Sequence, residues 1–177
     1  MANRRVSQAS PLSAGGPARQ WLWPMALLMG LTFSLSFARI GQAATTWTVC
    51  ASGCDYPSIK AAIAASTTLN GDTLAIAAGT YTEAGITVNK SLTLQGEDAA
   101  TTIVQAAASS GTAPDRVFTI PSGVSVTLQE LTIRYGRTIA YGGGLSNAGT
   151  LTLSHSTIRS NQATGYYGGG ASTTAAC

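Results

Sequence analysis

The alternation of apolar and polar residues in the second half of the chain is typical of short β-strands. The segments 126–128 (Val-Thr-Leu) and 131–133 (Leu-Thr-Ile) each place threonine between two apolar residues. Side chains alternate between the two faces of a strand, so each segment turns its apolar pair to one side. The separation between Leu128 and Leu131 is an odd number of residues, so one unbroken strand would turn the two apolar pairs to opposite faces. A bend at 129–130 is therefore expected, because only a bend lets both pairs face one interior.

This pattern repeats. Residues 126–134 return as 151–159, and the Tyr-Gly-Gly-Gly of 141–144 returns as 167–170. A fixed period of about 25 residues indicates stacked supersecondary units, and units of short strands build a β-solenoid. The segment 86–94 is expected to share the outline of 126–134, with one extra corner residue. The residues predicted to face the interior are Val88, Leu94, Val126, Leu128, Leu131, Ile133, Leu151, Leu153 and Ile158.

Glycines lie between the apolar triplets, where a coil of about 25 residues must turn. Glycine reaches φ > 0 without strain, so we expect it to form these corners. The corner residues predicted in this way are Gly136, Gly142, Gly143, Gly144, Gly149 and Gly165, with Asn147 and Asn161. A phosphate-binding loop is not indicated, because no lysine or helix pattern follows either glycine triplet.

An amphipathic helix is predicted near the start of the column. Ile59, Ala62 and Ile63 follow i, i+3, i+4 spacing, and Pro57 suits the first turn. Such a helix can cover the open end of the column, where strand edges are otherwise free. The turn at 70–72 leads into the strand 73–76, and the small-residue stretch 106–114 is the expected insertion out of the column.

Two long segments resemble a known superfamily. The repeat GGGLSNAGTLTLSHSTIRSNQATGYYGGG (142–170) is similar to repeats of secreted right-handed parallel β-helix proteins of the pectin-lyase-like superfamily, closest to the bacterial surface and autotransporter-like group. The segment YPSIKAAIAASTTLNGDTLAIAAGTYTEAGITVNKSLTLQGEDAATTIV (56–104) resembles the start of that fold. The resemblance implies an all-β right-handed parallel β-helix with a short N-terminal capping helix. It does not fix the function, because the superfamily includes lyases, hydrolases, esterases and adhesins.

The N-terminus has the pattern of a secretory signal peptide. Arginines precede an uncharged stretch at 20–38, and Gly41-Gln42-Ala43 offers small residues for cleavage before Ala44. We therefore expect a signal peptide at 1–43, a β-helix domain at 44–177, and an exported product at the cell surface or outside the cell. A membrane anchor is the alternative if the segment stays uncleaved. The chain stops just after a new coil begins, which suggests a truncated piece of a longer array.

The net charge of the chain changes once the predicted signal peptide is removed. The whole chain of 177 residues carries a formal charge of +3. Removing 1–43 takes away four arginines and no acid, which leaves six basic and seven acidic side chains. The basicity thus belongs to the signal, and nucleic acid is not an expected partner.

The cysteines fit export. Cys50 and Cys54 can close a short disulfide beside the helix, and Cys177 is left unpaired. Their spacing also matches half of a metal site, but no second pair follows, so no metal or cofactor is expected. His155, the only histidine, aligns with Glu130 at an expected exposed corner. None of the acids recurs one coil later, so no catalytic residue is predicted; they are Asp55, Asp72, Glu83, Glu97, Asp98, Asp115 and Glu130.

Aromatic and cationic residues repeat at positions that are expected to lie on the outside of the column. Arg134 aligns with Arg159, and Tyr141 with Tyr167. Neighbouring rungs lie about 4.8 Å apart, so each pair should stack. We call the predicted binding strip the Tyr/Arg strip; its residues are Tyr135, Tyr141, Tyr166, Tyr167, Arg134, Arg137 and Arg159.

Three functions fit this sequence. The first is an exported, non-catalytic surface or adhesin-type module that binds glycans or other surface molecules. The second is the N-terminal part of a polysaccharide-active lyase or hydrolase whose site lies in other coils. The third is a structural spacer, in which the Tyr/Arg strip is a repeat ladder without a ligand.

Overall fold

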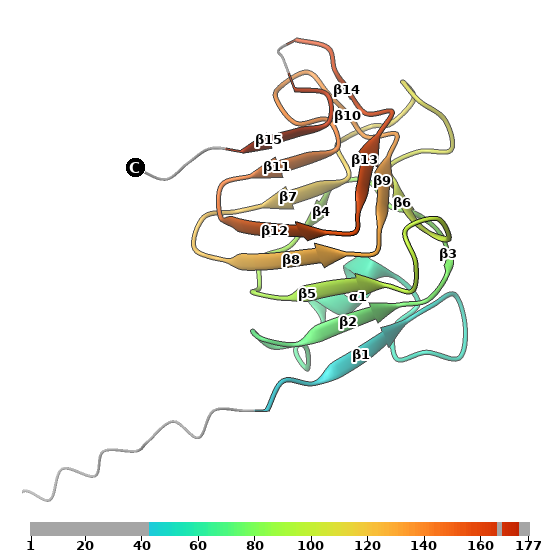
Figure 1. Cartoon of the computed structure of the whole chain (residues 1–177), viewed down its shortest axis with the longest axis vertical. Coiled ribbons are helices and arrows are strands. Elements are labelled where there is room, and N and C mark those ends of the chain that lie inside the picture. Colours follow the sequence, from blue (N-terminus) through green and yellow to red (C-terminus); the bar gives the residue numbers. More distant parts are fainter. Residues whose placement is uncertain (1–42, 166–167, 174–177) are drawn as a thin grey trace, which may run out of the picture. The chain divides into compact units, whose positions relative to one another are not determined.

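The structure is a computed structural model that describes residues 43–165 and 168–173. Nearly all of the predicted signal peptide (1–42), Tyr166, Tyr167 and Cys177 lie outside the described residues. The described part is a stack of β-coils with one short helix (Figure 1). The predicted fold class, an all-β parallel β-helix with a short N-terminal helix, is confirmed.

Three parallel sheets form the sides of the column, and after β1, which belongs to sheet A alone, each coil adds one strand to each sheet. Sheet A contains β1 (Thr46–Val49), β2 (Thr73–Ile76), β5 (Thr93–Gly96), β8 (Ser125–Gln129) and β12 (Thr150–Ser154). Sheet B contains β3 (Gly79–Thr82), β6 (Thr102–Gln105), β9 (Thr132–Arg134) and β13 (Thr157–Arg159). Sheet C contains β4 (Ile86–Thr87), β7 (Phe118–Ile120), β11 (Leu145–Asn147) and β15 (Ala171–Thr173). A separate pair joins β10 (Arg137–Thr138) to β14 (Gln162–Ala163).

The predicted repeat register is present. β8 pairs with β12 so that Leu128 faces Leu153, and β9 pairs with β13 so that Ile133 faces Ile158. The glycine triplets stack as well, because the Gly142 N–H donates to the Gly168 carbonyl at 3.0 Å. The stretch 106–114 contains no strand or helix and connects β6 to β7, and its Ala106 and Ala113 are buried in the core.

The core is a narrow apolar column in which Leu74, Leu94 and Leu128 stack in register from β2 to β8. Most residues predicted to face inward are buried. Leu153 is an exception and is 44% exposed. It occupies the position of Leu128, but β12 is the edge of sheet A among the described strands, so no further rung covers it. Leu151 and Ile158 are partly exposed for the same reason.

One prediction about the repeat is wrong. Residues 86–94 do not share the outline of 126–134, because they run from sheet C to sheet A through β4 and β5. The segment 126–134 instead runs from sheet A to sheet B. The two segments look alike because every corner of the column separates two apolar triplets. The sequence pattern alone therefore does not identify the corner of the column at which a segment lies.

The corners also differ from the prediction. The sharp turns after β8, β9, β12 and β13 use non-glycine residues at φ between 47° and 58°; these are Glu130, Tyr135, His155 and Ser160. Of the corner glycines predicted within the described residues, Gly142 has positive φ. The others are needed for close approach. A Cβ at Gly136 would lie 2.0 Å from the Gly143 carbonyl oxygen of the same coil, and one at Gly143 would lie 2.1 Å from that of Gln162.

The predicted helix is α1 (Ile59–Ala64), and it contacts β1, β2 and β4 at the first end of the column. Ile59, Ala62 and Ile63 are its buried residues, as their spacing predicts. The N-cap is Ser58, whose hydroxyl accepts the Ala61 N–H at 3.1 Å, so Pro57 precedes the helix rather than opening it.

The Cys50–Cys54 disulfide is present, with its Cα atoms 5.5 Å apart. It closes a short loop between β1 and α1. Structural disulfides persist in oxidising compartments, so this bond fits a protein that acts outside the reducing cytosol. Among the described residues, no helix is long and apolar enough to cross a membrane.

Candidate functional site

The middle of the Tyr/Arg strip is built on sheet B. Arg134 ends β9, and its Nε donates to the Gln105 Oε1 at 2.9 Å. The Gln105 amide in turn donates to the Thr82 hydroxyl at 3.0 Å. These residues share one register position on β3, β6 and β9, so the side chains form a polar ladder across three coils. Gln105 is 5% exposed, which fixes the guanidinium that it holds.

Two more strip residues join this ladder. Arg159 is the register partner of Arg134 on β13, as the repeat predicts. Tyr135 follows Arg134 at a corner with φ 58°, and the Arg134 guanidinium lies 4.7 Å from its ring centre. A cation over an aromatic face is attracted by the ring quadrupole. The structure therefore places Arg134, Tyr135 and Arg159 in one cluster.

The remaining strip residues are placed differently. Arg137 begins β10 in the small two-stranded pair and lines a shallow hollow together with Pro114 and Asp115. Tyr141 follows that pair and is 51% exposed. Its carbonyl accepts the Arg116 Nη1–H at 3.1 Å. The predicted stacking of Tyr141 on Tyr167, and the place of Tyr166, lie outside the described residues.

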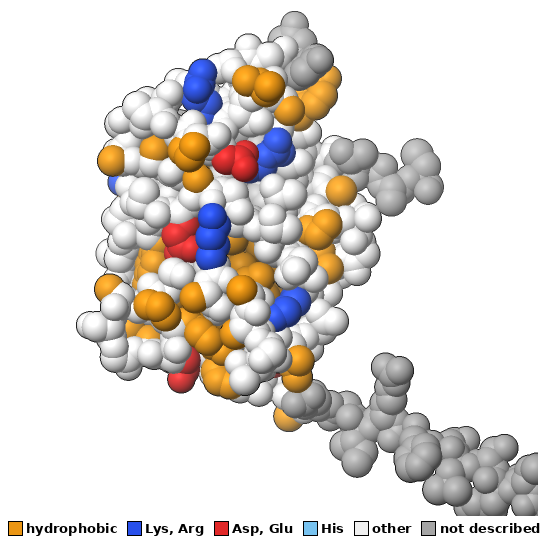
Figure 2. Space-filling view, turned by 180° about the vertical axis from the view of Figure 1, so that it is seen from behind, with side chains coloured by type: hydrophobic (Ala, Val, Ile, Leu, Met, Phe, Trp, Pro, Cys, Tyr) orange, Lys and Arg blue, Asp and Glu red, His pale blue; other side chains and the backbone are white. Residues whose placement is uncertain are grey.

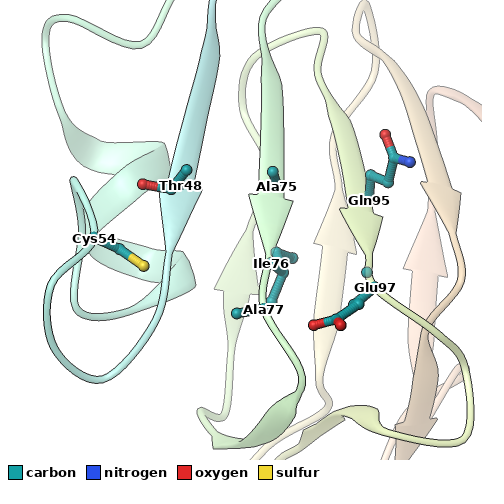
Figure 3. A pocket seen from close by; sticks show the side chains of 8 residues that line it. Thr48, Cys54, Ala75, Ile76, Ala77, Gln95 and Glu97 are labelled. Carbon is teal, nitrogen blue, oxygen red and sulfur yellow. The ribbon is translucent and has the colours of Figure 1, made fainter.

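A second hollow, of about 380 Å³, lies against sheet A near the first coil. Figure 3 shows Thr48, Ala75 and Gln95 on three neighbouring strands, with Cys54 at one side and Glu97 below Gln95. The cause of the hollow is local. Ala75 is the register partner of both Thr48 and Gln95, and its short side chain leaves space between them. The Glu97 carboxylate accepts the Ala78 N–H at 3.1 Å.

Charged side chains are spread thinly over the surface. Figure 2 shows Lys, Arg, Asp and Glu side chains on one face as small separate groups, without a broad patch of one sign. Among the described residues, no three His, Cys, Asp or Glu side chains converge as a metal site would require. His155 stands at the corner equivalent to Glu130, as predicted, with its Nδ1 3.5 Å from a Glu130 carboxylate oxygen.

Two acids have pKa values below the ordinary range, and both bind backbone. Asp55 accepts the Thr48 N–H and hydroxyl, and these bonds lower the pKa of its carboxyl. Asp72 is 4% exposed, and burial alone would raise its pKa. Hydrogen bonds from the Leu69 and Thr45 N–H groups and the Trp47 indole, with the charge of Lys90, outweigh burial and lower the pKa. Both acids therefore serve to hold the fold.

Tyr81 is a further titratable group with a structural role. Its one hydroxyl hydrogen is shared between the Val49 and Ala77 carbonyl oxygens, which lie 3.0 and 2.9 Å from the hydroxyl oxygen. Burial, and then the nearby Glu83 carboxylate, raise the pKa of this hydroxyl above its usual value. Neutral Tyr81, on β3, thus links the end of β1 to the residue that follows β2.

Two charged residues not predicted from the sequence hold α1. The two carboxylate oxygens of Glu83 each accept one N–H, from Ile59 and Lys60, at 2.9 Å. At the other end, the Lys90 ammonium donates to the Ile63 and Ala65 carbonyls at 2.7 Å. The first and last turns of a helix leave such backbone groups unpaired, and these charges match the helix dipole. No local motif signals contacts between residues more than 20 positions apart.

Hydroxyl columns are the other surface feature that the sequence analysis did not identify. On sheet A, five threonines occupy one unbroken register position; they are Thr46, Thr73, Thr93, Thr127 and Thr152. On sheet C, a shorter column contains Thr87, Thr119, Ser146 and Ser172. The alternation does predict threonine on the outside. The alignment of these residues into columns was not predicted, because the first coils are of unequal length and their register cannot be read from a fixed period.

The described residues form a parallel β-solenoid with a disulfide between β1 and α1. No protein family, curated protein or solved structure matches this chain.

Proposed function

We propose that this protein is an exported, non-catalytic β-helix module of the cell surface, of the pectin-lyase-like type, which binds glycans or other surface molecules through the Tyr/Arg strip. The observation that carries the proposal is the cluster of Arg134, Tyr135 and Arg159 on sheet B. A fixed guanidinium beside an aromatic ring is suited to sugars that carry carboxylate groups, because arginine pairs with carboxylates and aromatic faces pack on sugar rings.

Preorganisation supports this proposal. Gln105 is buried and holds Arg134 in place, so little side-chain entropy is lost when a ligand binds. Arg159 repeats the same charge one rung away, and a repeated surface gains avidity for long partners through several weak contacts. Among the described residues, by contrast, no three His, Cys, Asp or Glu side chains converge.

Export rests on two features. The signal-peptide pattern at 1–43 predicts secretion, and the Cys50–Cys54 disulfide fits an oxidising compartment. A surface location also agrees with a ligand that is itself found on cells or in their matrix.

A glycan array that includes acidic polysaccharides tests the proposal. We expect the exported product to bind carboxylated glycans, and Arg159→Ala to weaken binding by about tenfold, the loss expected for one charged contact of about 1.4 kcal/mol. Tyr141→Ala reports whether the strip extends beyond sheet B. Thr157→Ala, two residues earlier on the same strand, is the matched control and should bind normally.

Two results would contradict the proposal. The first is the absence of glycan binding by a folded product, which would favour the spacer hypothesis. The second is turnover of pectin, alginate or a similar polymer that disappears when a single aspartate is replaced, which would favour the lyase or hydrolase hypothesis.

A further inference from the structure

We propose that the outer face of sheet A, built around its threonine column, binds the surface of ice. This face is distinct from the Tyr/Arg strip on sheet B, and the inference does not depend on glycan binding. Its centre is the register position that threonine occupies on all five strands of the sheet.

The column is regular, because each threonine is the register partner of the next. Parallel in-register pairing places successive threonines about 4.8 Å apart along the column. This spacing is close to the repeat of oxygen atoms along the basal axis of hexagonal ice. Each threonine presents a hydroxyl that can occupy a water position and a methyl group that can fill the space between water molecules. A column of five such groups therefore matches a crystalline water surface over several repeats.

The backbone beneath the column is held firmly. Leu74, Leu94 and Leu128 each follow a column threonine and are fully buried in the core. The three middle threonines are partly buried by their neighbours, which limits the rotamers open to them. A β-branched side chain is already stiff at χ1. Little side-chain order is then lost when the face meets a rigid lattice.

The chemistry of the face favours ice over a glycan. The five strands of sheet A carry no Asp, Glu, Lys, Arg or His. Charged groups hold tightly bound water that does not fit an ice lattice. Within these strands the only aromatic residue is Trp47, which is half-buried with its ring 5.7 Å from that of Tyr56, so the face offers no aromatic platform for sugars.

The flanking positions add further hydroxyls, most regularly in the last two rungs of the sheet. There, Ser125 pairs with Thr150 on one side of the column; on the other side Ser154 adds a hydroxyl, and its partner Gln129 presents an amide. The hollow at Ala75 interrupts the face near the first coil. The contact is thus centred on β5, β8 and β12.

The test uses the exported product of the full chain in an ice-recrystallisation assay, together with adsorption of the fluorescently labelled protein to a growing ice crystal. We expect the wild type to keep ice grains small and to coat the crystal. Thr127→Tyr, at the centre of the contact, should raise the concentration required by about tenfold, as the loss of about 1.4 kcal/mol of contact energy would. Thr127→Val and Thr127→Ser separate the hydroxyl from the methyl contribution.

Thr119→Tyr is the matched control. Thr119 occupies the equivalent outer position of the sheet C column and has the same intermediate exposure as Thr127. We expect this variant to keep full activity. An inactive wild type, equal losses in both tyrosine variants, or an unaffected Thr127→Tyr would overturn the inference. So would a face that binds crystalline glycans and not ice. Thermal unfolding of each variant ensures that only folded proteins are compared.

Discussion

At the scale of single residues, Asp72 is a buried side chain that joins three segments at the start of the column. Its carboxylate accepts the N–H groups of Thr45 and Leu69 at 2.8 Å and the Trp47 indole at 2.9 Å. Asp72→Asn should lower the free energy of unfolding by about 1–3 kcal/mol at neutral pH, because an amide has one acceptor oxygen and cannot accept all three bonds that the buried carboxylate accepts. Denaturant unfolding measures this loss, and Asp98→Asn, at an exposed turn, is the control.

The same carboxylate should make the stability pH-dependent. The pKa of Asp72 is lowered in the folded protein, whereas in the unfolded chain it is near 3.9. Its contribution is therefore complete above the unfolded pKa and is lost as the pH falls through the folded pKa. Unfolding curves from pH 6 down to about pH 2 should show the wild type losing more stability below about pH 4 than Asp72→Asn does. Parallel curves for the two proteins would contradict this role.

At the scale of elements, α1 is too short to be stable alone, and the first coil holds it in place. Isolated helices shorter than about 12 residues are marginal in water, so the contacts of Glu83 and Lys90 at its two ends supply much of its order. Lys90→Met removes two charged hydrogen bonds to the last turn and should reduce the protection of the Ala62 and Ala65 amides from hydrogen exchange. Lys60→Met is the control, because Lys60 is exposed and contacts the Ala84 carbonyl instead. Equal protection in both variants would contradict the expected role of Lys90.

The helix and strands also show how much of the fold could be predicted from the sequence. The alternation in 126–134 predicts two strands and a bend, and β8, β9 and Glu130 are found there. The repeat predicts that Arg134 stacks on Arg159, because one period fixes their register. The contacts of Glu83 and Lys90 with α1 were not predicted, because each joins residues more than 20 positions apart and no local motif marks it. The strand positions follow from local patterns, whereas the contacts that position α1 and Arg134 arise only after folding.

At the scale of the whole molecule, the column is nearly one-dimensional, since each coil packs on its two neighbours. The effect of a core mutation should therefore depend on whether a coil lies on both sides of it. Leu128 and Leu153 provide a matched pair, because they share one register position on neighbouring strands. Leu128 is fully buried, and Leu153 is 44% exposed.

We expect Leu128→Ala to lower the free energy of unfolding by about 2–5 kcal/mol, the range for a large-to-small change in a packed core. Leu153→Ala should cost well under half as much, because its side chain is partly hydrated before the change and its removal leaves no closed cavity. Urea unfolding of both variants, with the m-value as a check on two-state behaviour, measures the difference. Equal losses would contradict the exposed edge position of Leu153. A small loss at Leu128 would instead contradict a tightly packed column, and with it the rigid backing that both proposed binding surfaces require.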